Sequence, residues 1–324
     1  MLVRFFLLFL LLMTAGCGPA TREPASTAAS YTVTDCKGTV VKMPAPPKKI
    51  LTLSMGTDTI MLGLVKPERM AAINYLLEDP VSSNIVELAK QVPIKINNPS
   101  VEEIMAMQPD LVIVPDWGNI AQVENLRDLG LKVVVCPGPK NLAEIKDTVR
   151  LLGQAIGEPE RGERLVALMD KTLADIRQKL DAMPQREIPR VVLISIMSGY
   201  GGSGCTFDEA CRLAGVINGR AEAGIQNGQT MSKEQLLAID PDILFLPSYT
   251  GHGSFDVVRY RRQYTEDPSL KNMKAVRNER MLYPRESYIY NGSQDFVFVV
   301  REIAYVIYGD EFAQSDREHL SVAD

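Results

Sequence analysis

Two stretches of this 324-residue chain decide its fold: residues 100–115, "SVEEIMAMQPDLVIVP", and residues 232–247, "SKEQLLAIDPDILFLP". Aligned at an offset of 132 positions, they share Ser, Glu, Ala, Pro, Asp and Pro. Each stretch opens with the capping box S-x-x-[E/Q], places a proline after the helix, and continues as a short apolar strand. The chain is therefore predicted to contain two similar α/β lobes.

The sequence around both stretches alternates strands and helices, which is typical of parallel sheets. Residues 31–44 read as a β-hairpin, and apolar strands are expected at 48–54, 110–116, 132–138, 190–197 and 242–248. A helical pattern starts at Pro159 and presents Leu165, Leu168 and Ile176 on one face. We predict an α/β fold of two Rossmann-like lobes, each with a mostly parallel sheet, joined by a single long α-helix. The expected divisions are a first lobe at 31–158, the helix at 159–182 and a second lobe at 183–324.

The N-terminus has the features of a secretory signal peptide. Arg4 precedes an apolar run at residues 5–13. This run is too short to cross a bilayer, because a transmembrane helix needs roughly 20 apolar residues. The ending Ala15-Gly16-Cys17 resembles the lipobox of bacterial lipoproteins, although Thr14 stands where that motif usually has leucine. We expect residues 1–16 to be removed, Cys17 to carry a lipid, and residues 17–30 to form a flexible tether. A plain signal peptide is the alternative.

Composition and residue counts exclude several classes of function. The net charge of −5 shows no basic excess, so nucleic acid is not an expected partner. The only histidines are His252 and His319, and no cysteine spacing matches a zinc pattern, so neither a metal site nor a cofactor is expected. Cys205 and Cys211 are close in sequence, and whether they form a disulfide is left open.

The loop "SGYGGSGCTF", residues 198–207, matches G-x-G-x-x-G, the spacing of a dinucleotide-binding loop. Such a site needs an acidic residue about 20 positions later at a strand end, and Glu222 does not lie at one. The chain also has no Walker lysine and no G-x-S-x-G elbow. We therefore expect no enzyme activity, and predict that the loop lines a cleft of the second lobe with Tyr200 as its main contact surface.

The repeated unit S-x-E-x-[IL]-x-x-[MI]-x-P-D-[LI], supported by "PPKKILTLS" at 46–54 and "CRLAGVINGRAE" at 211–222, resembles class III substrate-binding proteins of ABC importers. The resemblance covers about residues 31–310. It implies a monomeric, lipid-anchored carrier outside the cytoplasm that delivers a ligand to a permease dimer and, through it, to an ATPase. It also implies that Glu102 and Glu234 each bind a permease arginine. The alternative is that both carboxylates only stabilise their helix N-termini.

Ligands of open α/β sheets bind at the carboxyl ends of the strands, where this chain concentrates aromatic residues. The expected ligand-binding residues are Met55, Trp117, Tyr200, Gly201, Tyr249, His252, Arg285, Tyr288 and Tyr290. A ferric siderophore is the favoured ligand, with Arg285 placed to meet an anionic one. Cobalamin or a related corrinoid, haem held by Tyr249 or His252, and a tethered ligand sensor with no permease are the alternatives.

Overall fold

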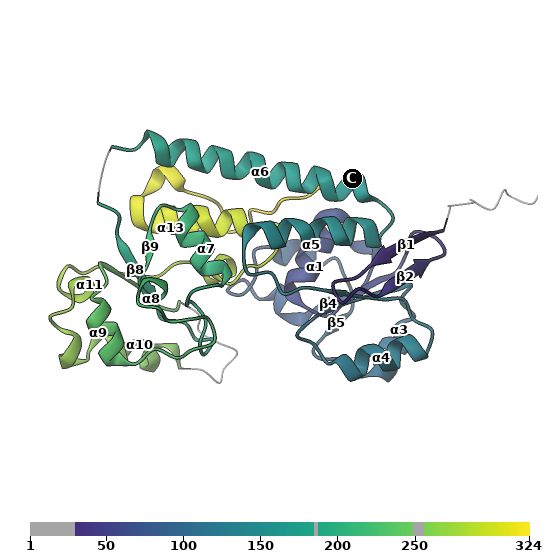
Figure 1. Ribbon diagram of the computed structural model, residues 1–324, viewed down its shortest axis with the longest axis horizontal. Coiled ribbons are helices and arrows are strands. Elements are labelled where there is room, and N and C mark those ends of the chain that lie inside the picture. Colours follow the sequence, from purple (N-terminus) through teal and green to yellow (C-terminus); the bar gives the residue numbers. More distant parts are fainter. Residues whose placement is uncertain (1–29, 185–186, 249–255) are drawn as a thin grey trace, which may run out of the picture.

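The computed structural model describes residues 30–184, 187–248 and 256–324. Two lobes lie beside each other, and the long helix α6 (Pro159–Ala182) runs along one side of both (Figure 1). The first sheet has the strand order β5-β4-β3-β6-β7 and the second β11-β10-β8-β9, and every neighbouring pair in both sheets is parallel. The predicted α/β fold of two lobes joined by a long helix is confirmed.

The first lobe begins with an antiparallel hairpin and continues as alternating strands and helices. Its strands are β1 (Tyr31–Thr34), β2 (Val40–Met43), β3 (Ile50–Thr52), β4 (Met70–Asn74), β5 (Lys95–Ile96), β6 (Leu111–Pro115) and β7 (Val133–Cys136). Its helices are α1 (Met55–Leu64), α2 (Val86–Ala89), α3 (Val101–Met107), α4 (Ile120–Asp128) and α5 (Leu142–Ala155), with 3-10 turns η1 (Pro67–Arg69) and η2 (Tyr75–Glu78).

The second lobe repeats this arrangement with shorter strands. They are β8 (Arg190–Leu193), β9 (Ile217–Asn218), β10 (Ile243–Phe245) and β11 (Met281–Leu282). Its helices are α7 (Thr206–Leu213), α8 (Gly219–Glu222), α9 (Lys233–Ile239), α10 (Val257–Thr265), α11 (Lys274–Arg277), α12 (Glu286–Ile289) and α13 (Phe296–Tyr308), with 3-10 turns η3 (Pro268–Leu270) and η4 (Asp310–Phe312). The strand expected at 190–197 ends at Leu193, because its partner β10 ends at Phe245.

The sequence repeat corresponds to a structural repeat. α3 and α9 both carry complete capping boxes, in which Ser100 pairs with Glu103 and Ser232 with Gln235. Each helix ends in a left-handed residue, Gln108 or Asp240, with φ of 51° and 44°. The strands that follow, β6 and β10, each pair beside the first strand of their sheet. The two lobes therefore have the same local folding pattern.

Helix α6 joins the lobes by packing on helices of both. It contacts α1 and α5 of the first lobe and α13 of the second. Glycines allow the closest approach to α5, since a Cβ on Gly153 would lie 3.0 Å from the Cα of Gly162. Leu165, Met169 and Ile176 of α6 are buried along the same helix. Its apolar face is therefore continuous across the two lobes.

A second connection between the lobes is a buried polar seam, which we define as Asn84, Gln294, Asp295, His319 and Leu320. The Asp295 carboxylate is fully buried and accepts hydrogen bonds from Asn84 Nδ2 at 2.7 Å, His319 Nδ1 at 2.8 Å and the Leu320 amide at 2.9 Å. Gln294 Nε2 donates to the backbone oxygen of Thr59 in α1 at 3.1 Å. Both lobes contribute to one hydrogen-bonded network.

The C-terminal segment, residues 313–324, leaves the second lobe and returns to the first. The Val322 amide donates to the oxygen of Gly63 in α1 at 2.8 Å, and the chain ends beside α6 over the first lobe (Figure 1). The expected second lobe, 183–324, therefore ends in a segment that packs on both lobes.

The seam makes stability depend on pH through His319. Burial lowers the pKa of His319, but the charge of the Asp295 carboxylate and its hydrogen bond outweigh burial and hold the pKa above its ordinary 6.5. A histidine whose pKa is raised by folding stabilises the protein fully below the pKa of the unfolded chain, and loses that contribution as pH rises through the folded pKa. We predict that the free energy of unfolding falls as the pH rises above about 6.5.

The measurement is urea unfolding across this pH range for the natural chain and for His319→Gln. The variant is expected to be less stable at pH 6.5 and to lose the decline at higher pH. Burial also raises the pKa of Asp58 to about 7, so a shallower decline near neutrality remains in both proteins. Arg317→Gln, which removes an exposed charge of the same segment without touching the seam, is the control and keeps the full decline. An unchanged pH profile in His319→Gln would contradict the assignment.

Candidate ligand-binding site

In each sheet the chain adds strands first to one side of the initial strand and then to the other. Ligands of such sheets bind in the crevice at the carboxyl ends of the strands, where the strand order reverses. The order reverses between β3 and β6 in the first lobe and between β8 and β10 in the second. The segments that follow β3 and β8 carry Met55 and Met197 at the carboxyl ends of their sheets. A crevice from each lobe therefore faces the region between the lobes.

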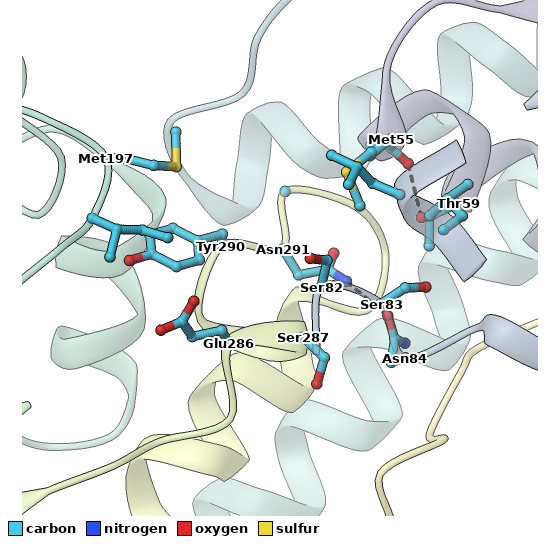
Figure 2. Close-up of a pocket in the computed structure, with 15 residues that line it drawn as sticks. Met55, Thr59, Ser82, Ser83, Asn84, Met197, Glu286, Ser287, Tyr290 and Asn291 are labelled. Carbon is cyan, nitrogen blue, oxygen red and sulfur yellow. Dashed lines mark hydrogen bonds between the residues drawn. The ribbon is translucent and has the colours of Figure 1, made fainter. Parts of the chain in front are cut away.

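The two crevices meet in a central cavity of about 270 Å³ (Figure 2). Its walls come from both lobes: Met55, Gly56, Thr59, Leu76, Leu77, Ser82, Ser83 and Asn84 from the first, and Ile196, Met197, Glu286, Ser287, Tyr290, Asn291 and Gly292 from the second. Met55 and Met197 lie on opposite sides, and Glu286 lies below Tyr290 in the view of Figure 2. The cavity thus joins thioether and aromatic surfaces to a few hydroxyls and amides.

The cavity wall carries few ionisable side chains. Among the described residues that line it there is no lysine, arginine or histidine, and Glu286 is the one acidic residue. The described part of the cavity therefore offers no positive charge to an anionic ligand.

Tyr290 lines the central cavity, and the ring of Tyr200 packs against the ring of Tyr290 without lining the cavity. The Tyr290 hydroxyl lies 3.0 Å from the Ser195 hydroxyl, and its ring centroid is 5.2 Å from that of Tyr200. The Tyr200 hydroxyl donates to the Ile289 oxygen at 3.3 Å. Burial raises the pKa of both phenols well above the ordinary value of 10, so both stay neutral. Tyr200 does not line the central cavity as expected, because its hydroxyl is used inside the lobe.

Arg285 and Tyr288 lie outside the central cavity and hold the C-terminal segment. Tyr288 is fully buried, and its hydroxyl donates to the Ser315 oxygen at 2.8 Å. Arg285 forms an ion pair with Glu302, at 2.9 Å from Nε to Oε2, and another with Asp316. Its guanidinium lies over the Tyr288 ring at 5.2 Å from the centroid. Neither residue lines the central cavity, because both are used in packing; their contact with a ligand stays a prediction.

The glycines of the 198–207 loop serve chain packing. Gly201 is buried with φ of 102° and lines no described cavity. A Cβ on Gly199 would lie 2.7 Å from the backbone carbon of Gly228, and one on Gly202 would lie 2.5 Å from that of Gln226. Cys205 and Cys211 are free thiols rather than a disulfide. The close backbone approach predicted from the glycines is made to the segment 225–229 instead of to a ligand.

Trp117 lies at a different cavity from the central one. Its side chain is 71% exposed and borders a polar cavity of about 290 Å³ in the first lobe, at the carboxyl ends of its strands. The same cavity is lined by the amide side chains of Asn74, Asn98, Asn119 and Gln122. Tyr249, His252 and Cys17 lie outside the described residues.

Several lining residues were missed by the sequence analysis. Met197 and Glu286 follow β8 and β11, so the rule that placed Met55 would have found them. Ser82, Ser83 and Asn84 lie beyond the η2 turn and follow no strand directly, so no sequence signal marks them.

Glu102 and Glu234 occupy equivalent positions on the two lobes. Each is exposed and is the second residue of its helix, α3 or α9. Both helices lie on the side of the molecule away from α6 (Figure 1). Hydrogen bonding to Ser232 lowers the pKa of Glu234, so that carboxylate is ionised at neutral pH. The lobes therefore present one exposed acidic helix start each on a shared side.

Two lobes with parallel sheets, a cavity between them and one long connecting helix define the class III fold of substrate-binding proteins. The model of the family described as periplasmic binding protein matches residues 50–288. The chain belongs to this family. It is a substrate-binding component of an ABC importer, a carrier rather than an enzyme, and a permease and a transported ligand are its partners.

Similar proteins differ in what they bind. A probable siderophore-binding lipoprotein of Bacillus subtilis strain 168 is 24% identical over 296 residues, covering 85% of this chain and 87% of that protein. A cobalamin-binding protein of Halobacterium salinarum strain R1 is 25% identical over 247 residues, or 72% and 64%. The periplasmic heme-binding protein RhuT from Roseiflexus sp. RS-1, in apo form, superposes with a TM-score of 0.67 at 23% identity, covering 82% of this chain and 99% of RhuT.

Within the described residues, no helix combines the length and hydropathy needed to cross a bilayer. The same part of the chain has no cluster of three or more His, Cys, Asp or Glu side chains that could hold a metal ion.

The packing of the glycine loop can be tested by substitution. Gly202→Ala places a methyl group against the backbone of Gln226, which cannot rotate away, so we expect a loss of stability of about 1–3 kcal/mol. Gly56→Ala is the control, because nothing lies within 4 Å of its Cβ position and alanine is favoured in a helix by up to about 1 kcal/mol. Urea unfolding measures both. Equal stability of the two variants would contradict the packing role.

Proposed function

We propose that this chain captures a ferric siderophore in the central cavity and delivers it to a permease, acting outside the cytoplasm while anchored by a lipid on Cys17. The observation that carries the proposal is the interlobe cavity, whose walls combine Met55, Met197 and Tyr290 with hydroxyl and amide groups. Ligand pockets of this kind gain affinity from apolar surface and orientation from a few polar groups.

The charge of the cavity narrows the siderophore class. Ferric citrate is anionic around its metal centre and requires cations there, which the described lining residues of the central cavity do not provide. Ferric trihydroxamates are neutral or positively charged at the metal centre, and they fit a wall whose described residues include no cation. The similarity to a protein described as a probable siderophore-binding lipoprotein supports the proposal.

The cavity volume implies that a chelate fills more than the central cavity. About 270 Å³ is at the lower limit of the roughly 300–1,000 Å³ of pockets that enclose drug-sized ligands. A corrinoid, which is larger still, is the second candidate. It too needs no cation, and contact with the exposed Trp117 ring would add to its binding affinity.

Ligand class is tested by calorimetric titration of the mature chain with a neutral ferric trihydroxamate, ferric citrate, haem and cobalamin. We expect the trihydroxamate to bind most tightly. Gly56→Trp puts an indole into the central cavity from a position with open space around it, so it is expected to weaken binding by about tenfold or more, a loss of about 1.4 kcal/mol.

Gly56→Ala is the matched control, because its methyl group leaves the cavity open. If Gly56→Trp binds the trihydroxamate as the natural chain does, the ligand does not occupy the central cavity. Tightest binding of cobalamin would favour the corrinoid.

We propose that Glu102 and Glu234 dock the loaded carrier on the permease. Two exposed carboxylates on pseudo-symmetric lobes match a permease dimer that offers one cation per subunit. Helix dipole stabilisation alone explains an acidic residue in the first turn, but it does not require the two helices to lie on one side of the molecule.

The double variant Glu102→Arg with Glu234→Arg is expected to keep ligand affinity and to abolish uptake into cells, because like charges would then face each other. Glu160→Arg with Asp175→Arg makes the same change of net charge on α6, at two exposed positions, and should leave uptake intact. Calorimetry and radioactive-iron uptake are the measurements. Normal uptake by the first pair would instead support a ligand sensor that works without a permease.

A further inference from the structure

A third cavity, the arginine cavity, adjoins the central one in the second lobe. It has a volume of about 270 Å³ and is bordered by the segment after β8, by Arg220 of α8 and by α10. Its walls include Ser198, Thr230, Tyr260 and Tyr264, and it shares Ile196 and Met197 with the central cavity. Met197 is seen in Figure 2 at the edge of the central cavity. A ligand in the central cavity is thus separated from this space by two side chains.

Arg220 is the charged residue of the arginine cavity, and it is only 4% exposed. Its Nη1 donates to the Tyr200 oxygen at 2.6 Å and its Nη2 to the Gln229 oxygen at 2.7 Å. Its Nε has no hydrogen-bond partner in the described part of the chain. A guanidinium has five N–H donors, so most of its donor capacity is not used by these two contacts.

No carboxylate of the described residues forms an ion pair with Arg220. The nearby acidic groups are the Cys205 thiol and the phenols of Tyr260 and Tyr264. Burial raises the pKa of Cys205 and of Tyr260, so these two stay neutral at pH 7.

A buried charge with no counter-ion is costly, and arginines inside proteins are normally paired. Backbone carbonyls supply only partial charges, and burial lowers the pKa of Arg220 accordingly. A guanidinium with unused N–H donors is the side chain that binds carboxylates and other oxyanions most strongly, whereas the Tyr260 hydroxyl already donates to the Ser195 oxygen at 3.1 Å. Arg220 therefore supplies the donors of an anion site, and the described residues that line the cavity include no carboxylate.

We propose that the arginine cavity is an oxyanion subsite that takes a carboxylate carried by the bound chelate, with Arg220 as its main donor. That the ligand is a metal chelate rests on the proposed function. That an anion binds beside Arg220 rests only on the arginine cavity. The chelate's metal centre then occupies the central cavity, while a pendant anionic arm reaches past Met197 to Arg220.

The first test uses the ligand-free chain and simple anions. Thermal unfolding is followed with increasing sodium acetate or phosphate at constant ionic strength set by chloride, and we expect a saturable rise in Tm. Thr230→Glu adds a carboxylate to the wall of the cavity and is expected to raise Tm in chloride and to lose the response to added anions. Ala223→Glu adds the same charge at an exposed position after α8 and keeps the response. No saturable response in the natural chain, or an equal response in Thr230→Glu, overturns the subsite.

The second test asks whether the anion belongs to the chelate. Ferrioxamine B ends in an ammonium group, and its N-succinyl derivative ends in a carboxylate on the same metal-binding scaffold. We expect the succinyl form to bind the natural chain about tenfold more tightly than it binds Thr230→Glu, while ferrioxamine B distinguishes the two proteins little.

Equal affinities of the succinyl form for both proteins, together with a response to acetate, would overturn the carboxylate arm and assign the subsite to free anions. Failure of both ferrioxamines to bind would refute the proposed function, and the response of the ligand-free chain to anions would still report on the subsite.

Discussion

The fully buried Asp295 carboxylate is the constraint on which the arrangement of the two lobes depends. A buried carboxylate is tolerated only when its oxygen atoms are matched by donors, and here the donors come from separate parts of the chain: Asn84 of the first lobe, and His319 and Leu320 of the C-terminal segment. Loss of any one donor leaves a buried oxygen atom undersatisfied. The seam therefore holds three chain segments in one relative position.

The same seam sets the geometry of the ligand site, because Asn84 lines the central cavity while donating to Asp295. Asn291, on the opposite lobe, donates to the Asn84 side-chain oxygen at 3.3 Å and lines the cavity as well. With α6 along one side and the seam beneath the cavity, the lobes have two connections and little freedom to hinge. Binding to such preformed walls costs little conformational entropy, so affinity depends on how well the ligand fits.

Sequence reasoning reached the fold because the evidence for it is local. Capping boxes, the proline positions and short apolar strands are read within a few residues, and the repeat of 100–115 in 232–247 doubled each signal. The rule that ligands bind at the carboxyl ends of strands also selected Met55 and Tyr290, which line the central cavity. Tyr288 and Arg285, which the same rule selected, do not line this cavity, although Glu286, Ser287 and Tyr290 beside them do. The partners that hold Tyr288 and Arg285 lie in the C-terminal segment, and no periodicity encodes where a segment without regular structure returns.

The ligand site is harder to predict from the sequence than the fold, because the fold and the site depend on different residues. The features that determine the fold are helix caps and buried strands, whereas the cavity walls come from the loops and helices that follow the strands. The three cavities differ in chemistry: thioethers and a carboxylate in the central one, amides and an indole beside Trp117, and a guanidinium with phenols at Arg220. Changing a few loop side chains would alter each of them without disturbing a strand or a cap. A family with one fold can therefore carry chelates of opposite charge, and the charges on the walls, rather than the overall similarity, are the better guide to what this chain binds.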